Sequence, residues 1–205
     1  MLNVLEKGKY RVEIVSNWKT LAKTENGYLL YHQGVLYKKE NLSDSKTILI
    51  GAMDNSWIKK RICKIRILER IFRMEPRSVI EDEGKVWIAR KGKIFEANMY
   101  ECTLKCVHSF RKKMGSPLNM IRIEDIKNFR TGIVYGEYWA NEEKEEVNIF
   151  QKQNEWKKIY SFGSGEIKHI HNIVLDKYRD GILVLTGDAD NESGILLCRN
   201  NFQET

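Results

Sequence analysis

The fold is decided by Ser78-Val-Ile-Glu-Asp-Glu-Gly-Lys-Val-Trp-Ile-Ala-Arg-Lys-Gly-Lys-Ile-Phe-Glu-Ala-Asn-Met-Tyr-Glu-Cys-Thr-Leu-Lys-Cys-Val-His-Ser-Phe110. Turns at Glu83-Gly84 and Lys91-Gly92 separate three short runs that are rich in β-branched and aromatic residues, and a fourth run follows at 103–110. Gly-containing turns between such runs are typical of β-hairpins. The stretch therefore predicts consecutive short antiparallel strands.

The same pattern of strands and turns recurs on both sides of this stretch. It predicts a hairpin at 28–39, strands at 120–124, 132–138, 147–151 and 156–160, and strands at 170–175, 181–186 and 194–198. Aligned on their third strands, the sets repeat every roughly 45 to 60 residues, which is the period of propeller blades. In a β-sandwich the turns would not group in this way. We therefore predict one all-β, β-propeller-like domain over residues 1–205, with about four blades of four short antiparallel strands, incomplete or open.

One segment breaks this pattern and predicts a single amphipathic helix near 58–74, inserted between the first two blades. Apolar residues recur there at helical spacing, at Ile58, Ile62, Ile65, Leu68, Ile71 and Phe72. The other face is basic, with Lys59, Lys60, Arg61, Lys64, Arg66, Arg70 and Arg73. Such a face suits phosphates, an anionic membrane surface or a protein partner. The alternative, which we favour from the sequence, is a solvated surface on a helix that covers the sheets.

Composition limits the class of protein. The chain has 205 residues with 42% hydrophobic and 31% charged, as in ordinary globular domains. Its net charge of +7 suits anionic partners, although nucleic acid would rest on charge alone and is not expected. The N-terminus lacks the apolar core of a signal peptide and no apolar run is long enough to span a membrane, so we expect a cytoplasmic protein.

Cysteine spacing superficially suggests a metal site at Cys102, Cys106 and His108. The surrounding residues have the pattern of a strand, in which a cysteine is usually a small buried hydrophobe. A structural metal site would also need a second cluster of ligands. We therefore expect structural, reduced cysteines and name no metal ligand or cofactor.

Two histidines and a carboxylate form the strongest candidate site. His169 and His171 lie two residues apart in a predicted strand and therefore share one face. Asp188 or Asp190 follows the next strand and is expected to approach them. Such a set could bind substrate hydroxyls, transfer a proton or hold a metal. The alternative is one buried histidine that is hydrogen-bonded to a backbone carbonyl, beside a turn that is capped by Asp188 and Asn191.

The last residues resemble a known repeat. Cys198-Arg-Asn200-Asn-Phe202-Gln-Glu-Thr205 is similar to a degenerate Asp-box, with Asn200 in place of the aspartate. Together with the His-x-His strand, Tyr178-Arg-Asp180 and Thr186-Gly-Asp188, it resembles sialidase-like, BNR (Asp-box) repeat β-propellers, in an uncharacterised subset. Sialidase-like propellers have six blades. Because this sequence stops at Thr205, before a fourth strand, we expect an open edge that a protein partner or a second copy covers.

The resemblance implies a function in carbohydrate binding or processing. Sialidases use arginines for a substrate carboxylate, a tyrosine nucleophile beside a glutamate, and an acidic proton donor. Tyr135 and Glu137 share a strand face and so could form such a pair. The alternative, which we favour from the sequence, is that Glu137 pairs with a neighbouring lysine or arginine and that Tyr135 and Tyr138 are packing residues. We expect an anionic glycan in a central channel, handled by the catalytic candidates His169, His171, Asp188 and Glu137 and the substrate-binding candidates Arg90, Arg77 and Tyr138.

The alternative function is a non-catalytic interaction scaffold, with the basic helix as its contact surface. Phosphate-binding glycine loops, His-Glu-x-x-His and Gly-x-Ser-x-Gly do not occur in the sequence. These absences argue against nucleotide-dependent chemistry and serine hydrolysis, and they leave the sequence without a motif that establishes an enzyme.

Overall fold

The computed structural model describes residues 2–7, 10–15, 18–188 and 192–204, with side chains described from residue 18 onward. The chain divides into two compact units, Met1–Val107 and His108–Thr205. The predicted single domain over 1–205 stays a prediction, and the two units are described separately.

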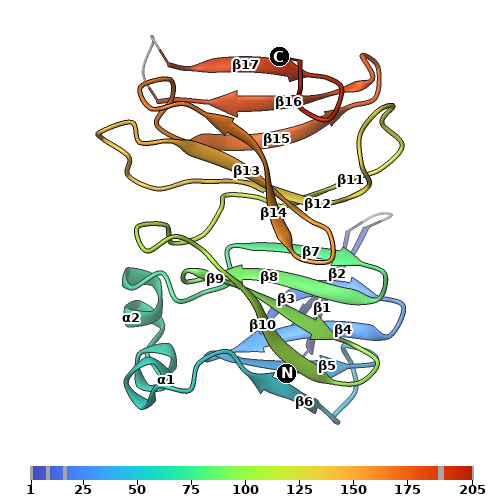
Figure 1. Cartoon of the computed structure of the whole chain (residues 1–205). Helices are drawn as coiled ribbons and strands as arrows, with labels where there is room; N and C mark the ends of the chain where they lie inside the picture. Colours follow the sequence, from blue (N-terminus) through green and yellow to red (C-terminus); the bar gives the residue numbers. More distant parts are fainter. Residues whose placement is uncertain (1, 8–9, 16–17, 189–191, 205) are drawn as a thin grey trace. The chain divides into compact units, whose positions relative to one another are not determined.

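The first unit consists of antiparallel sheets in which neighbouring strands are consecutive along the chain (Figure 1). A hairpin is formed by β1 (Leu2–Lys7) and β2 (Tyr10–Val15). One four-stranded sheet contains β3 (Lys19–Thr24), β4 (Gly27–His32), β5 (Val35–Lys39) and β6 (Ile48–Ala52). The other contains β7 (Ser78–Asp82), β8 (Lys85–Arg90), β9 (Lys93–Asn98) and β10 (Thr103–Ser109).

The second unit continues the same arrangement. One four-stranded sheet contains β11 (Ile121–Ile123), β12 (Gly132–Gly136), β13 (Val147–Lys152) and β14 (Trp156–Phe162). A three-stranded sheet contains β15 (Ile170–Asp176), β16 (Gly181–Thr186) and β17 (Gly194–Cys198). The prediction of an all-β protein built from successive antiparallel strands is therefore confirmed. The sequence pattern did not predict β1, β2, β3 or β6.

The predicted single helix is wrong. The segment forms two short helices, α1 (Trp57–Lys64) and α2 (Arg66–Ile71), separated by Ile65 in an extended conformation with φ −108° and ψ 103°. The break allows Cys63 and Glu69 both to be buried, although six residues of continuous helix would place them about 120° apart. Among the described residues, neither helix has the length and apolarity to cross a membrane.

Each unit has its own hydrophobic core. In the first, side chains from β4, β5, β8 and β9 pack together, with Leu29, Leu36 and Ile88 fully buried. In the second, the core joins β12, β13, β15 and β16, including Val134, Ile149 and Ile182. These core strands hold both sheets of the second unit in contact, which fixes the loop after β12 against the start of β15.

The cysteines only partly follow the prediction. Cys63 and Cys198 are buried and all four cysteines are free, as expected of structural thiols. The expectation of buried cysteines in this segment is wrong for Cys106 of β10, which is exposed, and Cys102, which precedes β10, is only half-buried. Cys106 is exposed although Leu104 and His108, on the same side of β10, are half-buried, so the strand pattern indicated strand formation but not which positions are covered.

A glycine sets the distance between the two sheets of the second unit. A Cβ atom on Gly136 would lie 2.5 Å from Cγ2 of Ile170, at the first residue of β15. The backbone N–H of Ile170 donates to the carbonyl of Glu137 over 3.0 Å, immediately after this contact. Close approach at Gly136 therefore positions the start of β15, next to His169.

We expect Gly136→Ala to destabilise the second unit by about 1–3 kcal/mol, the usual cost of an added methyl group in a packed site. Gly115→Ala is the matched control, because a Cβ there would meet nothing within 4 Å. Urea unfolding followed by circular dichroism measures both. Equal midpoints for the two variants would contradict the proposed close contact.

Candidate metal centre

The cluster of His169, His171 and Asp188 forms where β15 and β16 meet. The antiparallel register pairs Ile170 with Thr186, so the residues before β15 lie beside those after β16. The backbone N–H of Gly187 donates to the carbonyl of His169 over 3.3 Å, which brings Asp188 alongside. Gly187 makes this turn with φ +75°, and a Cβ there would lie 2.1 Å from the carbonyl oxygen of Glu192.

The three side chains converge through their terminal atoms. The pairing of β15 with β16 shifts between Ile170 and Asn172, which leaves His171 as the extra residue of a bulge. His171 Nε2 lies 3.3 Å from His169 Nε2 and 2.7 Å from Asp188 Oδ1. The distance from His169 Nε2 to Asp188 Oδ2 is 3.1 Å. The prediction that these residues lie together is confirmed by these distances.

A backbone carbonyl fixes the ring of His169. His169 Nδ1 lies 3.0 Å from the carbonyl oxygen of Trp139, and since a carbonyl can only accept, Nδ1 carries the hydrogen. In a neutral imidazole this leaves the lone pair on Nε2, which points toward His171 and Asp188. The side chain of His169 is 5% exposed, so its orientation is held by burial as well.

The rest of the cluster reaches solvent. The side chains of His171 and Asp188 are 33% and 55% exposed, so a small ligand has access from one side. The ring of Tyr138 packs against the other side of the cluster. Its centre lies 4.5 Å from the ring centre of His169 and 5.8 Å from that of His171. Partial desolvation opposes ionisation of Asp188, but interactions with both histidines prevail and hold its pKa below the ordinary value.

These positions are those of potential metal ligands. One atom from each of the three side chains lies within 4.8 Å of the others. Two ligands held about 2.0–2.1 Å from a tetrahedral ion are about 3.3 Å apart, close to the separations seen here. A carbonyl that orients a histidine through its other nitrogen is also the usual second partner in metal sites. Asp190, the alternative carboxylate, and Asn191 both lie outside the described residues.

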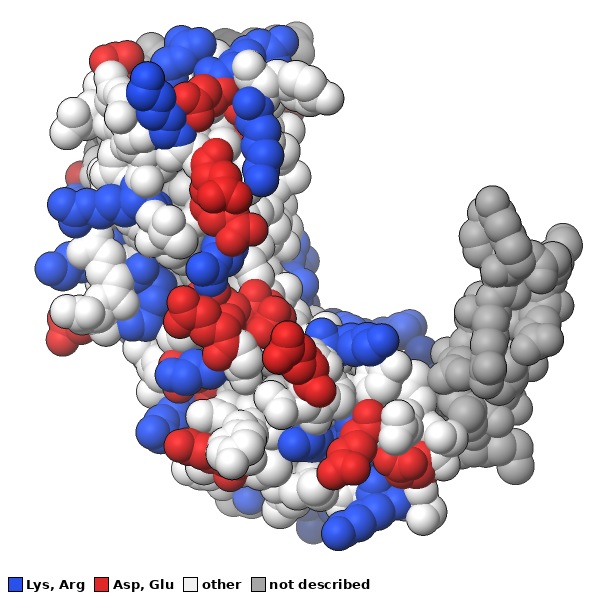
Figure 2. Space-filling view, turned by 90° about the vertical axis from the view of Figure 1, so that its right-hand side faces the viewer, with Lys and Arg blue, Asp and Glu red and all other residues white. Residues whose placement is uncertain are grey.

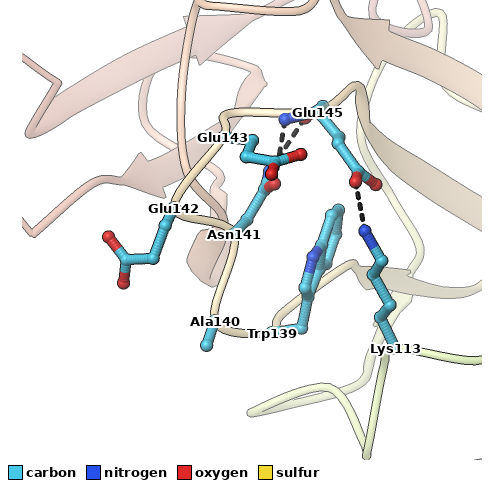
Figure 3. Close-up of a pocket in the computed structure, with 7 residues that line it drawn as sticks. All are labelled: Lys113, Trp139, Ala140, Asn141, Glu142, Glu143 and Glu145. Atoms are coloured by element: carbon cyan, nitrogen blue, oxygen red, sulfur yellow. Dashed lines mark hydrogen bonds and ion pairs between the residues drawn. The ribbon is translucent and has the colours of Figure 1, made fainter.

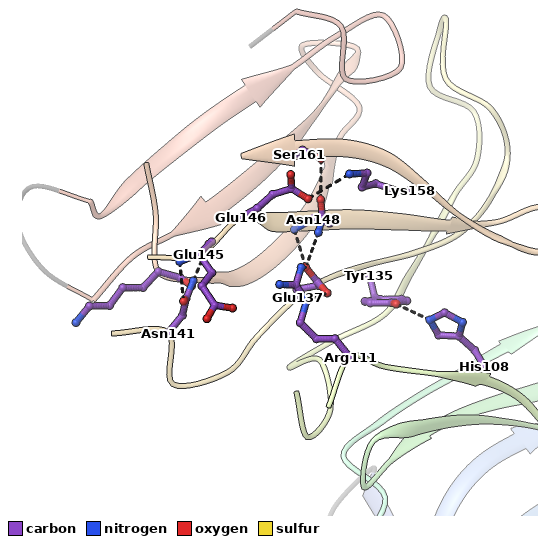
Figure 4. A network of polar contacts seen from close by, with 11 residues as sticks. His108, Arg111, Tyr135, Glu137, Asn141, Glu145, Glu146, Asn148, Lys158 and Ser161 are labelled. Carbon is purple, nitrogen blue, oxygen red and sulfur yellow. Dashed lines mark hydrogen bonds and ion pairs between the residues drawn. The ribbon is translucent and has the colours of Figure 1, made fainter. Parts of the chain in front are cut away.

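Glu137 belongs to a different network, which Figure 4 shows. Arg111 Nε donates to Oε1 over 2.8 Å, and a second guanidinium nitrogen contacts Oε2. The backbone N–H and the side-chain amide of Asn148 each donate to Oε2 over 2.9 Å. Because Glu137 is buried and both of its oxygens are occupied, its contacts favour a structural role over the expected catalytic one.

Tyr135 does not form the pair with Glu137 that the strand spacing permits. Its hydroxyl lies 2.7 Å from Nε2 of His108, within a group of aromatic rings that includes Phe110 and Phe150. Burial, and secondarily the charge of Glu137, raises the pKa of the Tyr135 phenol. A buried phenol with a raised pKa is a poor nucleophile, so these contacts do not favour sialidase-like chemistry at Tyr135.

The predicted substrate arginines lie in the first unit. Arg90 is 1% exposed, and its guanidinium contacts the carbonyl of Met74, the carboxylate of Asp54 and Sγ of Cys63. These buried contacts favour a structural role over binding of a substrate carboxylate. Arg77 is exposed, and its backbone N–H donates to the carbonyl of Ala89 over 3.0 Å. The third predicted substrate-binding residue, Tyr138, lies in the second unit and packs against the histidine cluster.

A pocket of about 210 Å³ lies in the second unit, at the loop that joins β12 to β13 (Figure 3). It is lined by Lys113, Trp139, Ala140, Asn141, Glu142, Glu143 and Glu145. Asn141 holds the loop, since its amide donates to the carbonyls of Glu145 and Lys168 over 2.8 and 2.9 Å. Three glutamates give the lining an acidic character, which does not suit an anionic glycan.

Sequence reasoning missed the residues that orient the site. The Trp139 contact uses a backbone carbonyl, and this has no signature in the sequence. Arg111 was also missed, although it packs 4.6 Å from the Trp139 ring centre and binds Glu137. Only the occurrence of an arginine near a buried glutamate could have suggested that pair.

Comparison with known proteins gives no family for this chain. No protein-family model matches it, and no curated protein matches it either. The resemblance to sialidase-like repeat propellers therefore stays a prediction, and function has to be argued from the geometry of the site.

Proposed function

We propose that the protein binds a divalent transition-metal ion through Nε2 of His169, Nε2 of His171 and a carboxylate oxygen of Asp188. The observation that carries this proposal is that one ligand atom from each of the three side chains lies within 4.8 Å of the other two, with the two Nε2 atoms 3.3 Å apart and each within 3.1 Å of one of the two Asp188 oxygens. Two imidazoles and one carboxylate suit zinc and neighbouring ions better than magnesium or calcium, which prefer oxygen ligands only.

The degree of exposure supports a site with a position for a further ligand. Structural zinc sites are usually closed by four protein ligands, whereas sites that act on substrates have three and bind water or substrate in the fourth position. The described residues supply three ligands, and Asp188 is more than half exposed. A bound zinc ion would supply a Lewis acid that polarises an oxygen of the fourth ligand.

The protein's own groups have defined roles in this proposal. The Trp139 carbonyl keeps the hydrogen of His169 on Nδ1, so that Nε2 is free to bind the ion. In the metal-free state the proton between His171 and Asp188 accounts for their 2.7 Å contact. Coordination through Nε2 of His171 requires this hydrogen to leave Nε2, either to Nδ1 of the same ring or to solvent.

Zinc is expected to raise the melting temperature of chelator-treated protein. At a free concentration of 100 times the dissociation constant, a ligand specific for the folded state adds about 2.7 kcal/mol. For a chain of this size that corresponds to about 5–10 °C. Differential scanning fluorimetry and competition titration against a chromophoric chelator measure the shift and the stoichiometry.

Magnesium is the control ion, and we expect no shift from it because it prefers six oxygen ligands. His32→Gln is the control variant, since His32 lies in the first unit, and we expect it to respond to zinc as the unaltered protein does. A zinc response that survives in His171→Ala would place the ion elsewhere and contradict the proposal.

We also propose that the successive sheets are blades of a propeller-like assembly. The antiparallel order of β3–β6, β7–β10 and β11–β14, each meander following the chain, supports this. The sheet of β15–β17 has three strands, and β17 is one of its edge strands. The expected association of this edge with a protein partner or a second copy stays a prediction. A crystal structure of the full chain tests the arrangement.

Glycan binding and a cytoplasmic location stay predictions from the sequence. The acidic lining of the pocket and the buried contacts of Arg90 give no support to an anionic glycan. A glycan-array screen with and without zinc checks that expectation directly, and a hit that depends on zinc would connect it with the metal site.

A further inference from the structure

The two helices of the first unit present their apolar side chains to solvent. The exposed fractions range from 47% to 71% for Trp57, Ile58, Ile65, Ile67, Ile71 and Phe72. We call this group the apolar surface of α1 and α2. Contiguous groups of this kind mark interaction sites, whereas single exposed apolar residues are ordinary.

The side of the helices that faces the unit buries a thiol and a carboxylate, whereas a usual amphipathic helix buries its large apolar side chains there. The buried residues are Cys63, 3.2 Å from a guanidinium nitrogen of Arg90, and Glu69, which accepts a hydrogen bond from the Tyr31 hydroxyl. Ile67 and Ile71 are separated by one helical turn and lie opposite Glu69. The helices are thus held by polar contacts, and most of their apolar side chains take no part in the core.

The same segment carries nearly all of the net charge. Residues 57–73 contain seven of the 35 basic residues and one of the 28 acidic residues, which leaves a net charge of +1 for all other positions. The acidic residue is Glu69, which is buried, so the exposed charges on this segment are all positive. Elsewhere the signs are mixed, as on the face drawn in Figure 2, where basic and acidic side chains are interspersed.

We propose that the apolar surface of α1 and α2, with its surrounding lysines and arginines, docks the protein on an anionic lipid membrane surface. Interfacial helices combine these two features, with Trp, Phe and aliphatic side chains in the headgroup boundary and basic groups at the lipid phosphates. The long stems of lysine and arginine allow both contacts from one face.

Two other partners fit the segment less well. The centres of protein–protein interfaces are depleted in lysine, whereas Lys59, Lys60 and Lys64 lie among the apolar residues here. Nucleic acid binds through its phosphates and gains little from exposed isoleucines. Trp57 at the start of α1, with the Arg61 guanidinium 5.8 Å from its ring centre, is suited to the boundary between headgroups and acyl chains.

Cosedimentation with vesicles tests the proposal. We expect the full chain to bind vesicles of 70% phosphatidylcholine and 30% phosphatidylserine, and to bind pure phosphatidylcholine at least tenfold more weakly. Arg66→Gln with Arg70→Gln should weaken binding by about 25-fold, because each basic residue near an anionic surface contributes about fivefold. Ile67→Ser with Ile71→Ser should weaken it by at least about tenfold through lost apolar contact.

Matched controls come from other exposed positions. Ile195→Ser removes an isoleucine that is 71% exposed on β17, and Lys105→Gln with Lys157→Gln removes two exposed charges. Both should bind as the unaltered chain does, and circular dichroism confirms that every variant is folded. Equal binding to both vesicle types, unchanged binding by the helix variants, or binding to duplex DNA or a protein partner without binding to vesicles would overturn the proposal.

Discussion

Asp188→Asn is expected to lower the affinity for zinc by at least about 100-fold. The change keeps the size of the side chain but removes the negative charge that both histidines contact, at 2.7 and 3.1 Å. Removing a group that hydrogen-bonds to a metal ligand already lowers metal affinity by about 10–100-fold, and removing a charged ligand itself should lower it further. Competition against a chromophoric chelator at constant pH and ionic strength measures the change.

The control for this variant is Asp125→Asn. Asp125 is an exposed aspartate of the same unit with φ +55°, a conformation that asparagine also adopts. It should bind zinc with unchanged affinity. His169→Ala provides a second comparison within the cluster, and we expect a loss as large as that of Asp188→Asn. If Asp188→Asn bound zinc within threefold of the unaltered chain, the carboxylate would not be a ligand.

Glu137→Ala is expected to lower the free energy of unfolding by about 3–5 kcal/mol. It removes one member of a buried ion pair and leaves Arg111, together with two N–H donors of Asn148, without an acceptor. The loss should exceed that of an ordinary hydrogen bond, because the remaining charge is partly desolvated. Urea unfolding followed by tryptophan fluorescence measures it.

The comparison is Glu146→Ala, on the same segment of chain. Glu146 pairs with Lys158 over 3.1 Å, and both side chains are about half exposed, so its removal should cost less than about 1 kcal/mol. The two variants also separate structure from catalysis. If Glu137→Ala kept full stability, the carboxylate would be available for the chemical role expected from the sequence.

Strand positions could largely be predicted because short apolar runs alternate with glycine turns. Among the strands that were missed, β3 has a weak pattern: it is Lys-Thr-Leu-Ala-Lys-Thr, mostly polar and partly exposed. The single helix was predicted from isoleucine spacing. This spacing indicates which side of a helix is buried only when the helix packs on an apolar surface. Glu69 and Cys63 find partners in Tyr31 and Arg90, distant in sequence, and this tertiary contact decides which side of the helices is buried.

The site could be predicted in part for a related reason. The two-residue spacing of His169 and His171, followed by Thr-Gly-Asp after the next strand, places three side chains at one end of a hairpin. A bulge and the carbonyl of Trp139 complete the arrangement, and both depend on backbone geometry. Glu137 and Arg90 were chosen by residue type. Whether such groups are available to a substrate depends on partners such as Arg111 and Asp54, which spacing along the chain does not indicate.

Anomalous diffraction from a zinc-soaked crystal tests the metal centre most directly. Data collected on both sides of the zinc absorption edge locate the ion without reference to activity or stability. We predict one peak at about 2.0–2.2 Å from Nε2 of His169, Nε2 of His171 and a carboxylate oxygen of Asp188. The proposed site would be contradicted by a peak among Glu142, Glu143 and Glu145 instead, or by no peak at the histidines after soaking at a saturating zinc concentration.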